Sequence, residues 1–150
     1  MSLNPFDLNN TLLAKHAQHV VLIHFPIALL ITGAAFDFIS QWTKRRGLVE
    51  AAYFNFLAAA VSTIPTLATG FLAWRFALEG QKLKGLLLQH IILAWTSSLL
   101  IWVIWAVHLR ARKRAQLRPT YRLWIELAAV AIIALTGHLG GFLSGVNGPG

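Results

Sequence analysis

The chain has 150 residues, of which 57% are hydrophobic and only 12% are charged, whereas a soluble domain carries about 25% charged residues. This composition excludes an ordinary soluble enzyme and a disordered chain, and the lack of cysteine excludes disulfides, iron–sulfur clusters, thiolate zinc sites and covalently attached haem. The net charge of +8 is typical of nucleic-acid-binding proteins, but those are rich in polar residues, so we expect no nucleic acid partner.

Four long stretches of the chain carry almost no charge, and they cover residues 20–42, 51–74, 86–109 and 122–143. Each is close to the length of about 20 residues that a helix needs to cross the hydrocarbon core. Because no water satisfies backbone groups there, the sequence predicts an all-α membrane protein, a single domain with four transmembrane helices in an up-down-up-down bundle. Before the first span, leucine and phenylalanine alternate with polar residues over residues 2–13, which is typical of a short helix on the membrane surface.

Basic residues are concentrated in two of the three connections between the spans. The first connection contains Lys44, Arg45 and Arg46, and the third contains five lysines and arginines between residues 110 and 118. The positive-inside rule places these two connections in the cytoplasm. We therefore expect an integral protein of the bacterial inner membrane, with both termini and residues 75–85 on the periplasmic side.

Three histidines lie at the same depth in three different spans. His24 and His90 lie about four residues inside the outer ends of their spans and His138 about five, so all three lie about 5–8 Å below the outer membrane face. Small residues accompany them, with Gly70 at this level of the second span and Gly137 and Gly141 next to His138. Small residues permit close helix packing and leave room for a flat ligand.

A haem b with two histidine ligands fits these constraints best, because it needs two neutral imidazoles on facing helices in an apolar interior. The first and third spans are diagonal in such a bundle, so His24 with His90 is one candidate pair, and His90 with His138 is the other. We expect one haem b near the outer face of an electron-transfer protein or redox-complex subunit. Its expected partners are membrane lipid, a quinol and a periplasmic cytochrome or other redox subunits, and oligomer formation stays open.

Two alternatives remain beside the haem. The histidines could form hydrogen bonds between helices in a non-redox structural or assembly subunit. His24, His90 and His138 could also bind a metal ion such as zinc or copper. The sequence has no nucleophile–base pair, phosphate-binding glycine loop or acidic metal cluster, so we expect at most an electron-transfer subunit and no complete enzyme.

Near the cytoplasmic end, each span contributes one polar residue, namely Asp37, Asn55, His108 and Glu126. Carboxylates inside a membrane are costly and need a reason. A nearby arginine would explain both carboxylates as ion pairs, the candidates being Arg45, Arg110 and Arg122. The alternative is a proton-entry or quinone head-group site. We expect His108 to be an interfacial residue near the basic connection, since no other span offers a histidine for a second haem there.

Two motifs carry a family resemblance. The first runs from His24 to Leu30 (HFPIALL) and is followed by Phe36 and Asp37, and the second runs from Thr136 to Gly141 (TGHLGG) and is followed by Gly145. With His90 at the matching place, nearly the whole chain resembles the small bacterial four-helix membrane proteins called domain of unknown function 2231. The resemblance implies His24, His138 and the adjacent glycines as the site. Some members resemble components encoded with or fused to cytochromes, which favours the redox interpretation.

Overall fold

The computed structural model describes residues 15–113 and 119–144, and the surface segment predicted over residues 2–13 lies outside them. The described residues contain helices and no strand. The helices are α2 (Lys15–Leu22), α3 (His24–Thr43), α4 (Arg46–Leu72), the π-helical turn η1 (Ala73–Ala77), α5 (Gly85–Lys113) and α6 (Tyr121–Leu143).

Four helical stretches are long and apolar enough to cross a membrane, namely Gln18–Thr43, Arg46–Phe76, Gly85–Lys113 and Tyr121–Leu143. Each of them contains the span predicted at that place and extends beyond it by a few residues at one or both ends. The prediction of an all-α membrane protein with four membrane-length helices is therefore confirmed. The up-and-down passage through the bilayer and the periplasmic position of the termini stay predictions.

Short connections turn the chain at the two ends of the bundle. Lys44 adopts the left-handed conformation (φ 54°) and donates its N–H to the Ser40 carbonyl, which ends α3, and Arg45 is extended before α4 begins. At the opposite end, Trp74 Nε1 donates to the Gln81 carbonyl at 2.9 Å across the connection that precedes α5. Following the predicted topology, the end with Lys44 is called the inner end and the end with Gln81 the outer end.

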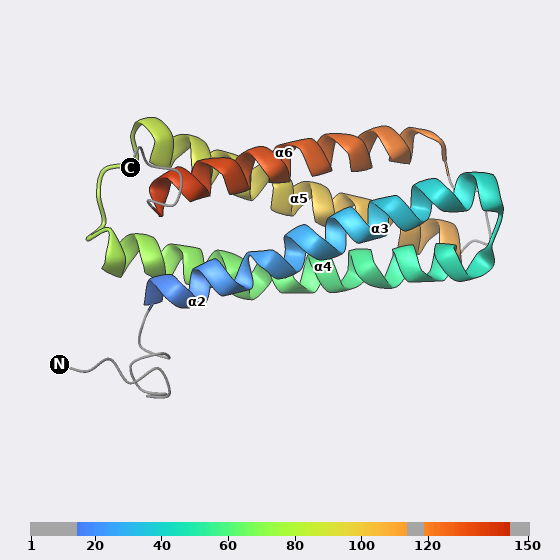
Figure 1. Cartoon of the computed structure of the whole chain (residues 1–150), viewed down its shortest axis with the longest axis horizontal. Coiled ribbons are helices and arrows are strands. Elements are labelled where there is room, and N and C mark those ends of the chain that lie inside the picture. The colour runs from blue at the N-terminus through green and yellow to red at the C-terminus, as the bar shows by residue number, and fades with distance from the viewer. Residues whose placement is uncertain (1–14, 114–118, 145–150) are drawn as a thin grey trace.

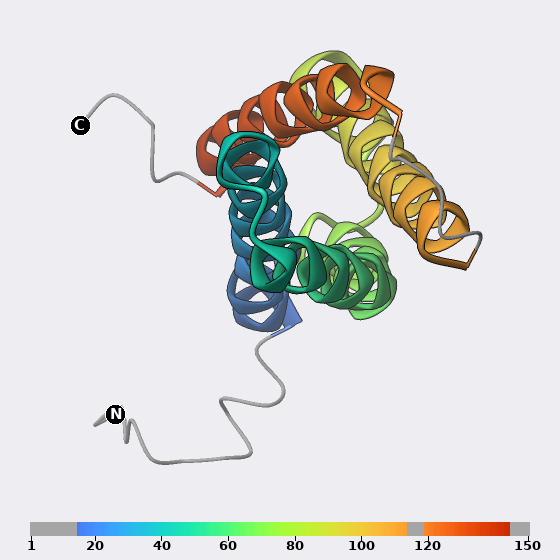
Figure 2. The same ribbon diagram turned by 90° about the vertical axis from the view of Figure 1, so that its right-hand side faces the viewer.

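The four long helices lie side by side in a bundle (Figure 1). α3 packs along α4 and α5 packs along α6, and the contacts of α4 with α5 and of α3 with α6 join these two pairs (Figure 2). α3 and α5 therefore lie diagonally across the bundle. The short helix α2 packs against α4 and η1 at the outer end.

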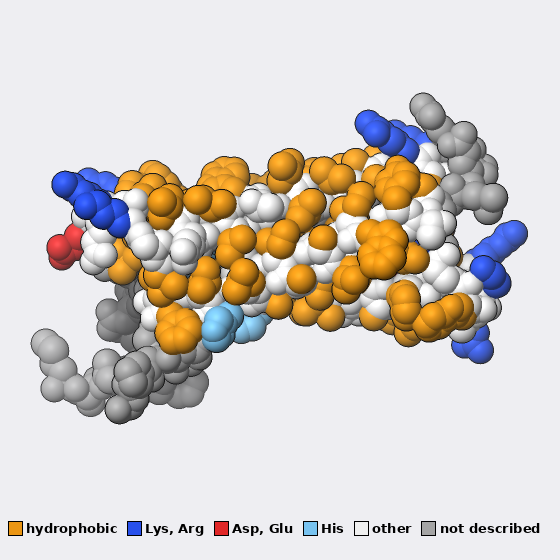
Figure 3. Space-filling model, turned by 90° about the horizontal axis from the view of Figure 1, so that it is seen from above, with side chains coloured by type: hydrophobic (Ala, Val, Ile, Leu, Met, Phe, Trp, Pro, Cys, Tyr) orange, Lys and Arg blue, Asp and Glu red, His pale blue; other side chains and the backbone are white. Residues whose placement is uncertain are grey.

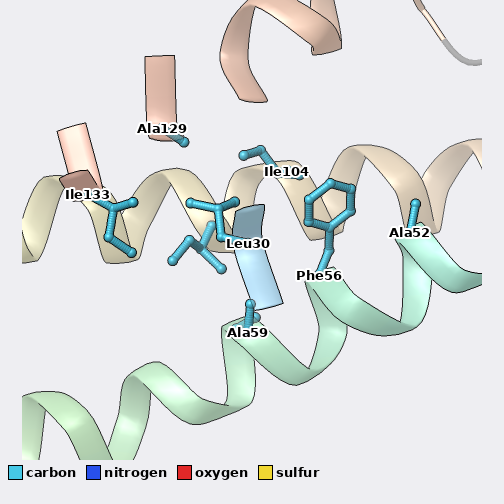
Figure 4. Close-up of a cluster of buried hydrophobic side chains, with 9 residues drawn as sticks. Leu30, Ala52, Phe56, Ala59, Ile104, Ala129 and Ile133 are labelled. Atoms are coloured by element: carbon cyan, nitrogen blue, oxygen red, sulfur yellow. The ribbon is translucent and has the colours of Figure 1, made fainter. Parts of the chain in front are cut away.

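The core is a layer of apolar side chains midway along the bundle. Its large members come from all four long helices, and alanines lie among them, as Figure 4 shows. The buried set is Leu30, Ala52, Phe56, Ala59, Ala60, Ile101, Ile104, Ala129 and Ile133. A Cβ atom on Gly33 would lie 2.8 Å from Phe56 Cε1, so the glycine makes room for this ring. Small residues let the helices approach closely, which supplies the van der Waals contact that holds membrane helices together.

The surface of the bundle is hydrophobic along its length. Many large apolar side chains are exposed, among them Phe54, Ile64, Trp95, Leu99 and Leu127. Figure 3 shows this hydrophobic surface between groups of lysine and arginine side chains at the two ends. A soluble protein would hide such a surface, whereas a membrane protein presents it to lipid.

Candidate functional site

The outer histidines His24 and His138 lie on the surface of the bundle. His24 is the first residue of α3 and His138 lies near the end of α6, and both side chains are exposed. The two helices touch at this level, because a Cβ atom on Gly137 would lie 3.9 Å from Ile27 Cδ1. Figure 3 shows histidine side chains next to one another on the hydrophobic surface towards the outer end.

Each of these two imidazoles has a neighbour that orients it. His24 Nδ1 lies 2.7 Å from the carbonyl oxygen of Val20 and donates to it, so in the neutral ring Nε2 carries the lone pair. The ring of His138 packs edge-on against Phe142, with the ring centroids 5.0 Å apart. In metal sites of proteins, a ligand histidine commonly donates one ring N–H to a backbone carbonyl, which orients its other ring nitrogen towards the metal.

His90 takes a different position. Its side chain is half-buried against α6, where Nδ1 donates to the Thr136 carbonyl at 3.1 Å. A Cβ atom on Gly140 would lie 3.2 Å from His90 Cε1, so the glycine allows the imidazole to lie against α6. His90 therefore forms a hydrogen bond between helices, and the structure does not bring it together with His24 and His138 in one interior pocket.

The glycines named from the sequence mainly serve packing. Gly70 faces His19, whose Cε1 would lie 2.9 Å from an added Cβ, and His19 Nδ1 lies 3.3 Å from Thr69 Oγ1, so this pair joins α2 to α4. Gly137 lies against Ile27 of α3, and the Gly141 carbonyl accepts a hydrogen bond from the Ser144 hydroxyl. Only Gly137 and Gly141 lie beside an exposed histidine.

A second group of polar residues lies inside the bundle near the inner end. Arg122 Nε donates to Asp37 Oδ2 at 2.7 Å, and His108 Nε2 lies 3.0 Å from Glu126 Oε1. The four residues are hereafter called the inner cluster, and each is at most 3% exposed. Asp37, His108 and Glu126 each offer one ligand atom within 4.8 Å of the other two.

The inner cluster confirms one sequence prediction and corrects another. Asp37 pairs with Arg122, which is one of the three arginines considered. Glu126 hydrogen-bonds to His108 and also interacts electrostatically with Arg122, and His108 is a buried residue rather than an interfacial one. Asn55, which lies at the same level, donates instead to the Ala51 carbonyl of its own helix. His108 lies seven residues after the buried Ile101 and therefore on the same face of α5, and this spacing was the signal for its inward direction.

The electrostatics of the inner cluster follow from its burial. Two carboxylates a few ångströms apart repel each other strongly where water is excluded, and Glu126 interacts electrostatically with both Asp37 and Arg122. Arg122 supplies one compensating charge and His108 a hydrogen bond. The arrangement thus fixes α3, α5 and α6 relative to one another, and it gathers oxygen and nitrogen ligands at one point.

Comparisons with known proteins identify one family. A family model described as "Predicted membrane protein (DUF2231)" matches residues 15–148. No curated protein and no solved structure matches the chain. The resemblance indicated by the two histidine motifs is therefore confirmed, and it covers all the described residues.

Proposed function

Since the chain belongs to the DUF2231 family of predicted membrane proteins, we propose a function inside the membrane, as an electron-transfer protein or redox-complex subunit that holds one haem b. In this proposal His24 and His138 would hold the iron, near the outer end where α3 and α6 touch. His90, the third candidate, holds α5 to α6 and is not a ligand.

The exposure of His24 and His138 carries the proposal. The two imidazoles are exposed on touching helices, next to exposed hydrophobic side chains such as Phe25 and Leu135. Polar side chains at such a position are expensive in lipid and usually mark a functional site. A bound haem would remove that cost, because His24 and His138 would hold its iron through their ring nitrogens.

The residues around the two histidines fit a flat hydrophobic group. Ala28 lies one turn from His24, and Ala134 and Gly141 lie about one turn on either side of His138, among larger exposed apolar side chains such as Leu135 and Phe142. Haem with two histidine ligands supplies reversible one-electron transfer. The chain's own part is to orient the ligands, through the bond from His24 to Val20 and the packing of His138 on Phe142.

The proposed partners follow from this position. A cofactor on the outer part of the bundle can exchange electrons with a quinol in the bilayer and with a cytochrome or other redox protein in the periplasm. The bacterial inner membrane and the periplasmic termini belong to the same proposal, because they rest on the basic residues of the inner connections.

A second candidate function is supported by the other histidines. His19, His90 and His108 each contact a residue of a different helix. Such hydrogen bonds are worth about 0.6 kcal/mol on average in membrane proteins. This observation favours a non-redox structural or assembly subunit, which would contain no haem.

Visible spectroscopy of the full chain tests the proposal. The protein is purified from haem-replete cells, and we expect a Soret band, with sharp α and β bands after reduction by dithionite. His24→Ala and His138→Ala should each abolish or shift the spectrum. His90→Ala is the matched control, because it removes a histidine of the same depth and should leave the spectrum unchanged.

Two results would contradict the proposal. A colourless protein would favour the structural subunit, or a metal-binding protein if elemental analysis finds stoichiometric zinc or copper. A coloured protein whose spectrum is lost in His90→Ala but kept in His138→Ala would refute the ligand pair assigned here.

A further inference from the structure

We propose that Asp37, His108 and Glu126 bind a divalent first-row transition-metal cation of the Zn²⁺ type inside the inner end of the bundle. The site is separate from the outer histidines, and it does not depend on whether haem is bound there.

The geometry of the three side chains supports a cation. They come from α3, α5 and α6, and their ligand atoms lie within 4.8 Å of one another. Zinc holds nitrogen and oxygen ligands at about 2.0–2.2 Å, which places neighbouring ligands of a tetrahedral site about 3.4 Å apart. The widest ligand separation therefore has to shorten by no more than about 1.4 Å, which side-chain rotation can provide.

The chemical types of the ligands favour the same class of ion. One imidazole and two carboxylates form a mixed nitrogen and oxygen set, which suits Zn²⁺, Mn²⁺ or Fe²⁺ better than a soft copper(I) ion. Three protein ligands and one open position are typical of zinc sites that bind a further small ligand. The imidazole Nε2 of His108 already points at Glu126, and the tautomer with its proton on Nδ1 can use Nε2 as a ligand.

The charges of the inner cluster give a reason for binding. Asp37 and Glu126 bring two negative charges to one buried point, and Arg122 balances one of them. A divalent cation between the carboxylates replaces their repulsion by attraction, an effect that is strong where water is excluded. Arg122 then acts as a positioning residue, since its bond of 2.7 Å holds the Asp37 carboxylate from outside the ligand set.

The site lies close to the inner end, where an ion can enter. Arg122 is the second residue of α6, and Asp37 lies six residues before the end of α3, which corresponds to about 9 Å along the helix. A cation from the inner side therefore needs to pass only the first turns of the helices, and it does not cross the apolar core around Leu30 and Phe56.

Equilibrium dialysis with Zn²⁺ tests the proposal. The full chain carries His24→Ala and His138→Ala, so that the outer histidines cannot bind the probe, and metal is first removed with EDTA. We expect one Zn²⁺ per chain by elemental analysis. Glu126→Gln and His108→Gln should each weaken binding by at least about 10-fold, the size of effect that even indirect changes at metal sites produce.

Glu50→Gln is the matched control. Glu50 is an exposed carboxylate near the inner end that pairs with Arg112 at 2.9 Å, and its loss should leave Zn²⁺ affinity unchanged. Circular dichroism and gel filtration establish that each variant is folded. If a cluster variant does not fold, the Co²⁺-loaded parent decides the question, because a four-coordinate site gives intense visible bands and a six-coordinate surface site gives weak ones.

The proposal is overturned if the parent protein binds no Zn²⁺, if its Co²⁺ spectrum is that of a six-coordinate ion, or if Glu50→Gln weakens binding as much as Glu126→Gln. The haem proposal can fail without affecting this result, because the tested chain lacks both proposed haem ligands.

Discussion

The ion pair between Asp37 and Arg122 makes a quantitative prediction about stability. The Asp37 and Arg122 side chains are 0% and 3% exposed. Removing one partner of a buried ion pair costs about 3–5 kcal/mol, because the charge of the other partner stays buried without compensation. Asp37→Asn keeps the shape of the side chain and removes only its charge. Since Glu126 still lies near Arg122, we expect a loss of about 3 kcal/mol, or about 100-fold in the folding equilibrium.

A double-mutant cycle separates the ion pair from other effects of the substitution. The double variant Asp37→Asn, Arg122→Gln leaves no unbalanced charge in this pair, so it should be more stable than the sum of the two single losses predicts. We expect a coupling of at least about 1 kcal/mol, which is within the range measured for residues in one network. Glu50→Gln breaks the exposed pair with Arg112 and should cost less than about 1 kcal/mol.

Unfolding by sodium dodecyl sulfate in mixed micelles measures these free energies. The six tryptophans of the chain report unfolding by fluorescence, and EDTA in all samples keeps metal binding out of the comparison. A loss for Asp37→Asn that is no larger than the loss for Glu50→Gln would refute the reasoning. A coupling of zero would also refute it, because the two charges would then not be acting on each other.

Two further predictions concern packing and orientation. Gly33→Ala places a Cβ atom 2.8 Å from Phe56 Cε1 and should lower the free energy of unfolding by about 1–3 kcal/mol. Gly47→Ala has no atom within 4 Å of its added Cβ and should not lower it. Equal losses for the two variants would contradict the packing described here. Because the chain lacks cysteine, single cysteines report sidedness: a membrane-impermeant maleimide added to intact spheroplasts should label Gln81→Cys and spare Lys44→Cys. The reverse labelling pattern would overturn the assigned orientation.

The fold could be predicted because its main signals are local. The length of each apolar stretch predicts a membrane-spanning helix, and the rise of 1.5 Å per residue gives the depth of each histidine along that helix. The position of His24, His90 and His138 in one layer follows from these two facts alone. Depth, however, does not determine the direction in which a side chain leaves its helix.

Which side chains of a membrane helix face the core was hard to predict, because lipid and core are both apolar. In a soluble helix the polar face marks the outside, but a membrane helix is hydrophobic all round, so the 3.6-residue pattern loses most of its contrast. The buried face of α3 consists of Pro26, Leu30, Gly33, Asp37 and Ser40, and His24 lies off that face. Among these residues, the small Gly33 and the polar Asp37 and Ser40 were the signal from which the buried face could have been identified.

The partner of each carboxylate could not be fixed for a related reason. Asp37 and Arg122 are 85 residues apart, and their pairing depends on α3 lying against α6 rather than on any local pattern. The sequence therefore offered three arginines without a choice among them. For Glu126, the sequence offered no reason to expect a hydrogen bond to His108, because a neutral histidine carries no charge.

The outer and inner sites are separated by an apolar layer, and this bears on how they could act together. The buried hydroxyls of Thr63 and Ser97 donate to carbonyls of their own helices, and Leu30 and Phe56 lie among them in the core. The hydroxyls of Thr63 and Ser97 are thus satisfied within their own helices, in the layer between the inner cluster and the outer histidines. A cation or charge at the inner cluster can influence the outer end through the positions of α3 and α6, because each of these helices contributes residues to both sites.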